Sequence, residues 1–204
     1  MSDNLWRLAR IGSSGADRQF WRVVRWGERR AVVAIEPVRY GLAMADDDLG
    51  FPTGSPDDKE LLLQWLRYLR GAVLRNVEGL DDQQARWTPD RKLISLLGIV
   101  NHLTRVEWRW IDGAFGDADV SRVEAEFAPG PELALETAVL GYRKRGAATD
   151  AMVLATDLSA ASDPKGWGEG HDLRWVLLHL INETARHAGH ADATRELLDG
   201  KTGE

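Results

Sequence analysis

Apolar residues recur every three or four positions in four stretches of the chain, which is the period of amphipathic helices. Polar and glycine-rich segments separate these stretches and predict helices over about residues 57–79, 92–114, 131–155 and 171–199. We expect Ser55 to cap the start of the first helix. Four long helices joined by moderate loops, without an internal repeat, predict an all-α four-helix bundle.

The beginning of the chain has a different pattern. Residues 21–40 alternate imperfectly between apolar and polar positions and predict a short hairpin across Gly27. Residues 1–43 carry a charge of +4, whereas the rest of the chain carries -10. We therefore expect residues 1–50 to be an N-terminal appendage and residues 51–204 to be the bundle domain. Our main hypothesis is that the appendage is an upstream extension outside the native domain; the alternative is a genuine small β-element packed on the bundle.

Composition narrows the class of protein. Hydrophobic residues make up 44% of the chain and charged residues 28%, which is typical of a globular protein. No apolar run approaches the roughly 20 residues that span a bilayer, and the N-terminus lacks the apolar stretch of a secretory signal, so we expect a cytoplasmic protein. There is no cysteine, which excludes a disulfide framework, a cysteine-bound zinc and a catalytic thiol of the protein's own. The net charge of -6 argues against a nucleic-acid partner.

The histidines are clustered. At about 100° per residue, His179, Glu183, His187 and His190 fall on one stripe of the last predicted helix, about 80° wide, that also carries apolar residues. Burying a carboxylate beside several imidazoles is costly unless the groups are paired or bound to a metal. His102 lies midway along the second predicted helix, and spacing alone does not connect it to the last one.

A metal site is one interpretation of this stripe. Glu183 and His187, four residues apart, can bind one ion from one helix, and imidazole with carboxylate ligands suits zinc, iron or nickel better than calcium or magnesium. An ordinary hydrogen bond between the two side chains fits the same spacing equally well. The spacing by itself leaves both interpretations open.

Two segments resemble the DinB superfamily, in the branch found in actinobacteria: LLGIVNHLTRVEWRW and RWVLLHLINETARHAGHADATRELLDG. The resemblance covers about residues 55–200. It implies a four-helix bundle that holds one divalent metal, with zinc as the first choice and nickel or iron as alternatives. Carried over to this chain, the metal ligands are His102, Glu183 and His187.

The His, Glu and His ligands match the pattern of the mycothiol-dependent maleylpyruvate isomerases. The chain ends soon after the last helix, so we expect the extra C-terminal domain of those isomerases to be missing. The resemblance therefore implies the wider group of thiol S-transferases, with a mycothiol-like thiol as co-substrate and a small electrophile as the second substrate. We expect no nucleic-acid or membrane partner, and we allow for a homodimer.

Two other interpretations of a metal site remain open. The metal would activate water for hydrolysis if Glu183 were a general base instead of a ligand. A non-catalytic protein would use the metal only to hold the bundle together. In the transferase hypothesis, His190 is the candidate catalytic residue, as a proton carrier one turn beyond His187; the alternative is a core histidine bonded to a neighbouring oxygen.

The other chemistry-bearing residues have more ordinary alternatives. His179 is expected to pack or to support a metal ligand, and His171 to lie on the surface or cap the helix. Trp110 is a candidate wall of the substrate site, with core packing as the alternative. Three arginines are candidates for binding a carboxylate or sugar-bearing substrate, or else are solvated: Arg145, Arg174 and Arg186.

Overall fold

The computed structural model describes residues 24–26, 29–31, 50–90, 92–116 and 118–203. The chain divides into two units, Met1–Ala43 and Met44–Glu204, and each is described by itself.

In the first unit, strands β1 (Val24–Trp26) and β2 (Arg29–Ala31) pair antiparallel, with Trp26 opposite Arg29. This pairing confirms the predicted hairpin, although Gly27 lies outside the described residues. That residues 1–50 form an appendage outside the native domain stays a prediction.

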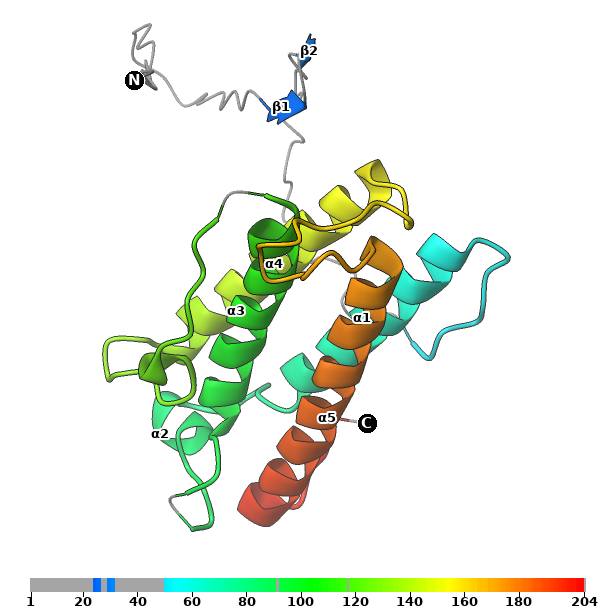
Figure 1. Ribbon diagram of the computed structural model, residues 1–204. Coiled ribbons are helices and arrows are strands. Elements are labelled where there is room, and N and C mark those ends of the chain that lie inside the picture. The colour runs from blue at the N-terminus through cyan, green and yellow to red at the C-terminus, as the bar shows by residue number, and fades with distance from the viewer. Residues whose placement is uncertain (1–23, 27–28, 32–49, 91, 117, 204) are drawn as a thin grey trace, which may run out of the picture. The chain divides into compact units, whose positions relative to one another are not determined.

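The second unit is helical, and the prediction of an all-α four-helix bundle is confirmed (Figure 1). Its elements are α1 (Asp58–Arg75), α2 (Asp82–Ala85), α3 (Leu96–Phe115), the 3-10 helix η1 (Glu124–Glu126), α4 (Leu135–Ala155) and α5 (Leu173–Asp199). None of the described helices is long and apolar enough to span a membrane.

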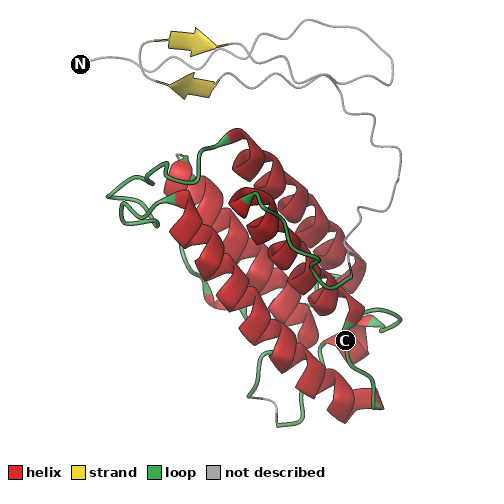
Figure 2. Cartoon of the chain, turned by 90° about the vertical axis from the view of Figure 1, so that its right-hand side faces the viewer, coloured by secondary structure: helices red, strands yellow, loops and turns green. Residues whose placement is uncertain are grey.

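The four long helices pack as two parallel pairs. Helix α5 packs between α1 and α3, while α4 packs on α3 and α1 (Figures 1 and 2). Helices α1 and α5 run in one direction, because Arg174 donates to Asp58 near their first turns and Arg195 donates to the carbonyl of Asn76 near their ends. Helices α3 and α4 run in the opposite direction (Figure 1).

The parallel direction of α3 and α4 determines the path of the chain between them. The connection over residues 116–134 must return along the length of α3, which is about 30 Å for 20 helical residues at 1.5 Å each. It carries η1 back to the first half of α3, where the carbonyls of Ala125 and Glu126 accept hydrogen bonds from the amide of Asn101. The connection is thereby placed beside the first half of α3.

A buried polar layer lies between two apolar clusters of the core. Arg70 of α1 donates to both oxygens of Glu107 on α3, at 2.7 and 2.8 Å, and to Asp150 of α4 at 2.8 Å. Gly146 makes room for this guanidinium, since a Cβ there would lie 3.3 Å from it. Electrostatic attraction to Glu107 and Asp150 raises the pKa of Arg70 even though desolvation by burial opposes it. The layer joins three helices at one level.

The helix boundaries differ in detail from the predicted ones. Helix α1 is capped by Asp57, whose carboxylate accepts from the second and third residues of the helix, whereas Ser55 accepts from the backbone of Asp57. Helix α3 begins at Leu96, four residues after the predicted start, and its cap Ser95 accepts from the backbone of Gly98; the helix ends at Phe115, one residue after the predicted end. The short helices α2 and η1 were not predicted, because three or four residues are too few to show a helical period.

Candidate metal centre

Helix α5, which carries the polar stripe, has a capped start and a defined end. Asp172 caps α5 by accepting from the backbone of Trp175 at 2.8 Å, and Gly200 ends the helix in the left-handed region with φ 77°. Between these ends the helix is unbroken over Leu173–Asp199, so Glu183 and His187 lie one turn apart on the same face.

Helix α3 brings His102 to this pair. One ligand atom from each of His102, Glu183 and His187 lies within 4.8 Å of the other two. The Nε2 atom of His102 lies 3.3 Å from Oε1 of Glu183, and Nε2 of His187 lies 3.6 Å from the same oxygen. The two imidazole rings are 4.7 Å apart between centroids. The three residues that the sequence and the resemblance brought forward therefore converge on one point.

The cluster is partly exposed. The side chain of His102 is 4% exposed, whereas those of Glu183 and His187 are 22% and 19% exposed. A site with a buried floor and a partly open rim leaves room for a molecule to approach. Hydrogen bonding from His102 and then from His187 outweighs desolvation and holds the pKa of the Glu183 carboxyl well below its usual range. Glu183 therefore faces the two histidines as a carboxylate.

A second carboxylate supports His102 from behind. Oε1 of Glu126 lies 2.7 Å from Nδ1 of His102, and Glu126 is fully buried. Its other oxygen accepts a hydrogen bond from Arg109, which is also fully buried. Burial raises the pKa of Glu126, but the hydrogen bonds from Arg109 and His102 outweigh this effect and lower it overall. An anionic Glu126 binds the Nδ1–H tautomer and leaves Nε2 of His102 facing the cluster.

Sequence analysis did not find Glu126 or Arg109. One signal was present: Arg109 follows His102 by seven residues and so lies on the same face of α3, where a buried cation requires a carboxylate partner. Nothing in the spacing identifies that partner as Glu126, because it lies in the three-residue helix η1 within a connection.

His190 lies on α5 beyond the cluster and does not share its meeting point. Its side chain is half-buried, and its Nε2 atom is buried without a hydrogen-bond partner among the described residues. Burial lowers the pKa of His190, and the neighbouring His187 lowers it further. His190 follows His187 by three residues on α5 and so lies on a neighbouring part of the same helix face.

The remaining predicted histidines belong to an aromatic stack. His179 packs on Trp110 with ring centroids 4.2 Å apart, and His171 stacks on Trp175 at 4.0 Å. His171 is exposed, and the helix is capped by Asp172 instead.

The three candidate arginines are mostly engaged elsewhere. Arg145 pairs with Asp112 at 2.6 Å, and Arg174 forms an exposed pair with Asp58. Only Arg186 approaches the cluster, with Nη1 3.9 Å from an oxygen of Glu183.

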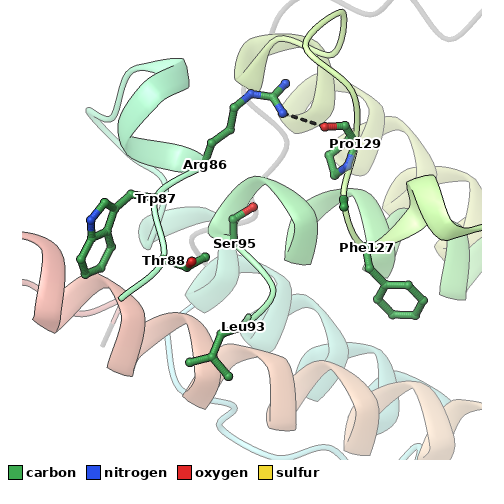
Figure 3. A pocket seen from close by; sticks show the side chains of 8 residues that line it. Arg86, Trp87, Thr88, Leu93, Ser95, Phe127 and Pro129 are labelled. Carbon is green, nitrogen blue, oxygen red and sulfur yellow. Dashed lines mark hydrogen bonds between the residues drawn. The ribbon is translucent and has the colours of Figure 1, made fainter. Parts of the chain in front are cut away.

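A recess of about 470 Å³ lies between residues 86–95 and the returning connection (Figure 3), and one residue of its lining also contacts the cluster. Phe127 belongs to both, because its ring lies 4.7 Å from that of His102 in a stacked arrangement and it also lines the recess. Arg86 donates to the carbonyl of Pro129 at 2.7 Å (Figure 3). The lining residues are Arg86, Trp87, Thr88, Leu93, Ser95, Phe127, Ala128 and Pro129.

Comparison with known proteins supports the family resemblance. A solved structure, described as the conserved protein of a locus from Enterococcus faecalis, matches with a TM-score of 0.58 and 15% identity, over 72% of this chain and 100% of that one. This likeness concerns the fold alone. A comparison with curated proteins finds no match. The family model described as mycothiol-S-transferase matches residues 61–200. The match spans all four long helices, and the chain belongs to the mycothiol S-transferase family, as the DinB-like resemblance predicts.

Proposed function

We propose that the chain is a metal-dependent thiol S-transferase that joins a mycothiol-type thiol to a small electrophile. The observation that carries this proposal is the convergence of His102, Glu183 and His187 at a partly open site. Two imidazoles and one carboxylate suit a zinc ion, with nickel or iron as alternatives, and three protein ligands leave a position for a substrate. The membership of the family supports the choice of thiol.

A divalent ion bound by these residues would lower the pKa of a coordinating thiol, so that the thiol is held as its thiolate at neutral pH. Other side chains of the protein would orient a ligand and remove the thiol proton. Glu126 fixes the ring of His102, since a carboxylate on Nδ1 keeps Nε2 free as a donor atom. His190 is proposed to carry the thiol proton away, because its buried Nε2 has no hydrogen-bond partner among the described residues and lies on the same helix as two ligands.

The recess beside Phe127 is proposed to hold the part of the thiol that does not react. Its lining residue Phe127 stacks on His102, and hydroxyl-bearing residues contribute to its lining, among them Thr88 and Ser95. Polar groups of this kind suit a thiol with a hydrophilic body. The cytoplasmic location, the absence of a nucleic-acid partner and a homodimer remain predictions.

The test begins with elemental analysis of the purified protein in buffers without chelators. We expect about one equivalent of a first-row metal, and its loss in the variants His102→Ala and His187→Ala. The variant His171→Ala is the matched control, because it removes an exposed histidine that lies outside the cluster. A native protein that binds no such metal would refute the proposal.

Transferase activity is then measured with mycothiol and iodoacetamide, and the conjugate is quantified by mass spectrometry. The native protein should accelerate conjugation, and the ligand variants should not. Glu183→Gln separates the two enzyme hypotheses: loss of metal indicates a ligand, whereas retained metal with lost hydrolytic activity indicates a general base. A holoprotein that neither binds mycothiol in calorimetry nor conjugates it would favour a non-catalytic role for the metal.

A further inference from the structure

Four aromatic rings form a continuous ladder beside the metal centre. Trp175 and His179 lie four residues apart on α5, His171 precedes that helix and stacks on Trp175, and Trp110 of α3 joins them from the facing helix. Trp175 and His179 are nearly parallel, with centroids 5.6 Å apart and an interplanar angle of 6°. Trp110 contacts both rings, at 5.6 Å and 4.2 Å between centroids. We refer to these four residues as the aromatic ladder.

The ladder retains ring surface that the bundle does not cover. Trp175 is 40% exposed, and Trp110 and His179 are half-buried. A surface tryptophan is not unusual by itself, but here His171, Trp175 and His179 are stacked and Trp110 lies tilted against two of them, so that flat faces and edges meet at one place. Such a surface is suited to another planar ring, which would stack on it in an offset arrangement.

The ladder begins one helical turn from the proposed metal ligands. His179 precedes Glu183 by four residues, a rise of about 6 Å along the helix. Side chains four residues apart on a helix are neighbours, so His179 and Glu183 share one face of α5. A single aromatic ring bound on the ladder would therefore reach the centre where the proposed thiolate sulfur is held.

A cation lies near this surface. Arg122 is exposed, and its guanidinium carbon lies 5.9 Å from the ring centroid of Trp167. The Trp167 ring packs at Gly113, where it would lie 3.1 Å from an added Cβ, and Gly113 follows Trp110 on α3 by three residues. The charge favours a ligand with an anionic or electron-withdrawing substituent.

We propose that the aromatic ladder is the binding surface for the electrophile, and that the electrophile is a planar aromatic compound with an anionic or electron-withdrawing substituent. This inference rests on the proposed transferase function. In the reaction the thiolate sulfur forms a bond to the electrophilic carbon, and the bond from that carbon to its leaving group breaks. The leaving group departs as an anion with the electron pair, and the thiol proton has passed to a base of the protein or solvent.

Binding is tested first with an unreactive probe and the metal-loaded protein. We expect 3,5-dinitrobenzoate to bind in calorimetry more tightly than cyclohexanecarboxylate, which has the same charge but no aromatic ring. Trp175→Ala should raise the dissociation constant of the dinitrobenzoate about two- to tenfold, the range for one lost aromatic contact. Trp175→Phe should restore most of the affinity. Trp108→Ala is the matched control, because this tryptophan of α3 is similarly exposed, at 37%, and makes no ring contact with the ladder.

Arg122→Gln tests the cation. It should weaken binding of 3,5-dinitrobenzoate and leave binding of neutral 1,3-dinitrobenzene unchanged. Equal weakening of both compounds would overturn the role of this charge.

Turnover is tested with mycothiol and two electrophiles. Trp175→Ala should lower kcat/KM for 1-chloro-2,4-dinitrobenzene about two- to tenfold and leave that for iodoacetamide and the metal content unchanged. Equal values for native protein and Trp175→Ala in both the binding and the turnover assays would overturn the ladder as the electrophile site. Ladder-dependent binding of the probe with no conjugation of any electrophile would instead support an aromatic binding surface and refute the transferase function.

Discussion

The buried carboxylate of Glu126 gives the sharpest test of the proposed metal centre. Replacing it with glutamine preserves the shape of the side chain but removes the charge that faces His102 and Arg109. We expect Glu126→Gln to weaken metal binding, because the imidazole of His102 loses an anionic partner that orients its ring and increases its basicity.

The magnitude follows from the contact. A hydrogen bond to a charged group contributes about 1.5–3 kcal/mol, and the 2.7 Å contact between Nδ1 of His102 and Glu126 is fully buried. Loss of a group that orients a ligand typically reduces metal affinity by about 10- to 100-fold, which is about 1.4–2.8 kcal/mol. The two estimates agree. Glu126→Ala should in addition cost about 3–5 kcal/mol of folding free energy, because Arg109 is then buried without its counter-charge.

The assay separates these effects. Metal affinity is measured by competition with a chromophoric chelator, and the free energy of unfolding is measured in urea on the metal-free protein. Glu124→Gln is the matched control, since this carboxylate lies in the same 3-10 turn but is exposed. A folded Glu126→Gln protein whose metal affinity stays within about twofold of the native value would refute the assignment of Glu126 as a positioning residue.

Three further predictions concern the frame and the ion. Glu107→Ala should lower the free energy of unfolding, measured in urea, by about 3–5 kcal/mol, because the buried Arg70 loses one of its two carboxylate partners and keeps only Asp150. A change below about 1 kcal/mol, typical of an exposed ion pair, would contradict this. Gly98→Ala should weaken metal binding, since its Cβ would lie 2.4 Å from the backbone oxygen of Phe127. Gly189→Ala, whose Cβ would meet no other packed group within 4 Å beyond its own helix backbone and chain neighbours, should instead stabilise α5 by up to about 1 kcal/mol. Removing a metal present at 100 times its dissociation constant should cost about 2.7 kcal/mol and lower Tm by about 5–10 °C in calorimetry; an unchanged Tm would argue against binding in the native state.

The bundle could be predicted because each long helix carries its own repeating pattern. The period of the last helix placed Glu183 and His187 on one inward stripe, and the structure has them there. His102 was different, since helical spacing says nothing about which helix faces which. The family resemblance identified His102 as a candidate ligand, and the packing of α3 against α5 places it beside Glu183 and His187.

Glu126 was beyond prediction for a different physical reason. Its position depends on the parallel direction of α3 and α4, which forces the connection over residues 116–134 back along α3. A loop carries no hydrophobic period, so nothing local indicates which of its acidic residues is buried. Arg109 did signal that a carboxylate must lie nearby, but its partner is set by the path of the chain.

This path makes the returning connection as important to the proposed metal site as the helices. Gly98 allows the backbone of Phe127 to approach α3, because any larger side chain would meet its carbonyl oxygen. The same approach brings Glu126 into contact with Nδ1 of His102 and stacks the ring of Phe127 on that imidazole. The ring of His102 is thus held by a loop, although its backbone belongs to a helix. Substitutions in the connection should therefore alter the proposed metal site without replacing a ligand. A thiol bound in the recess would contact the same segment that orients His102.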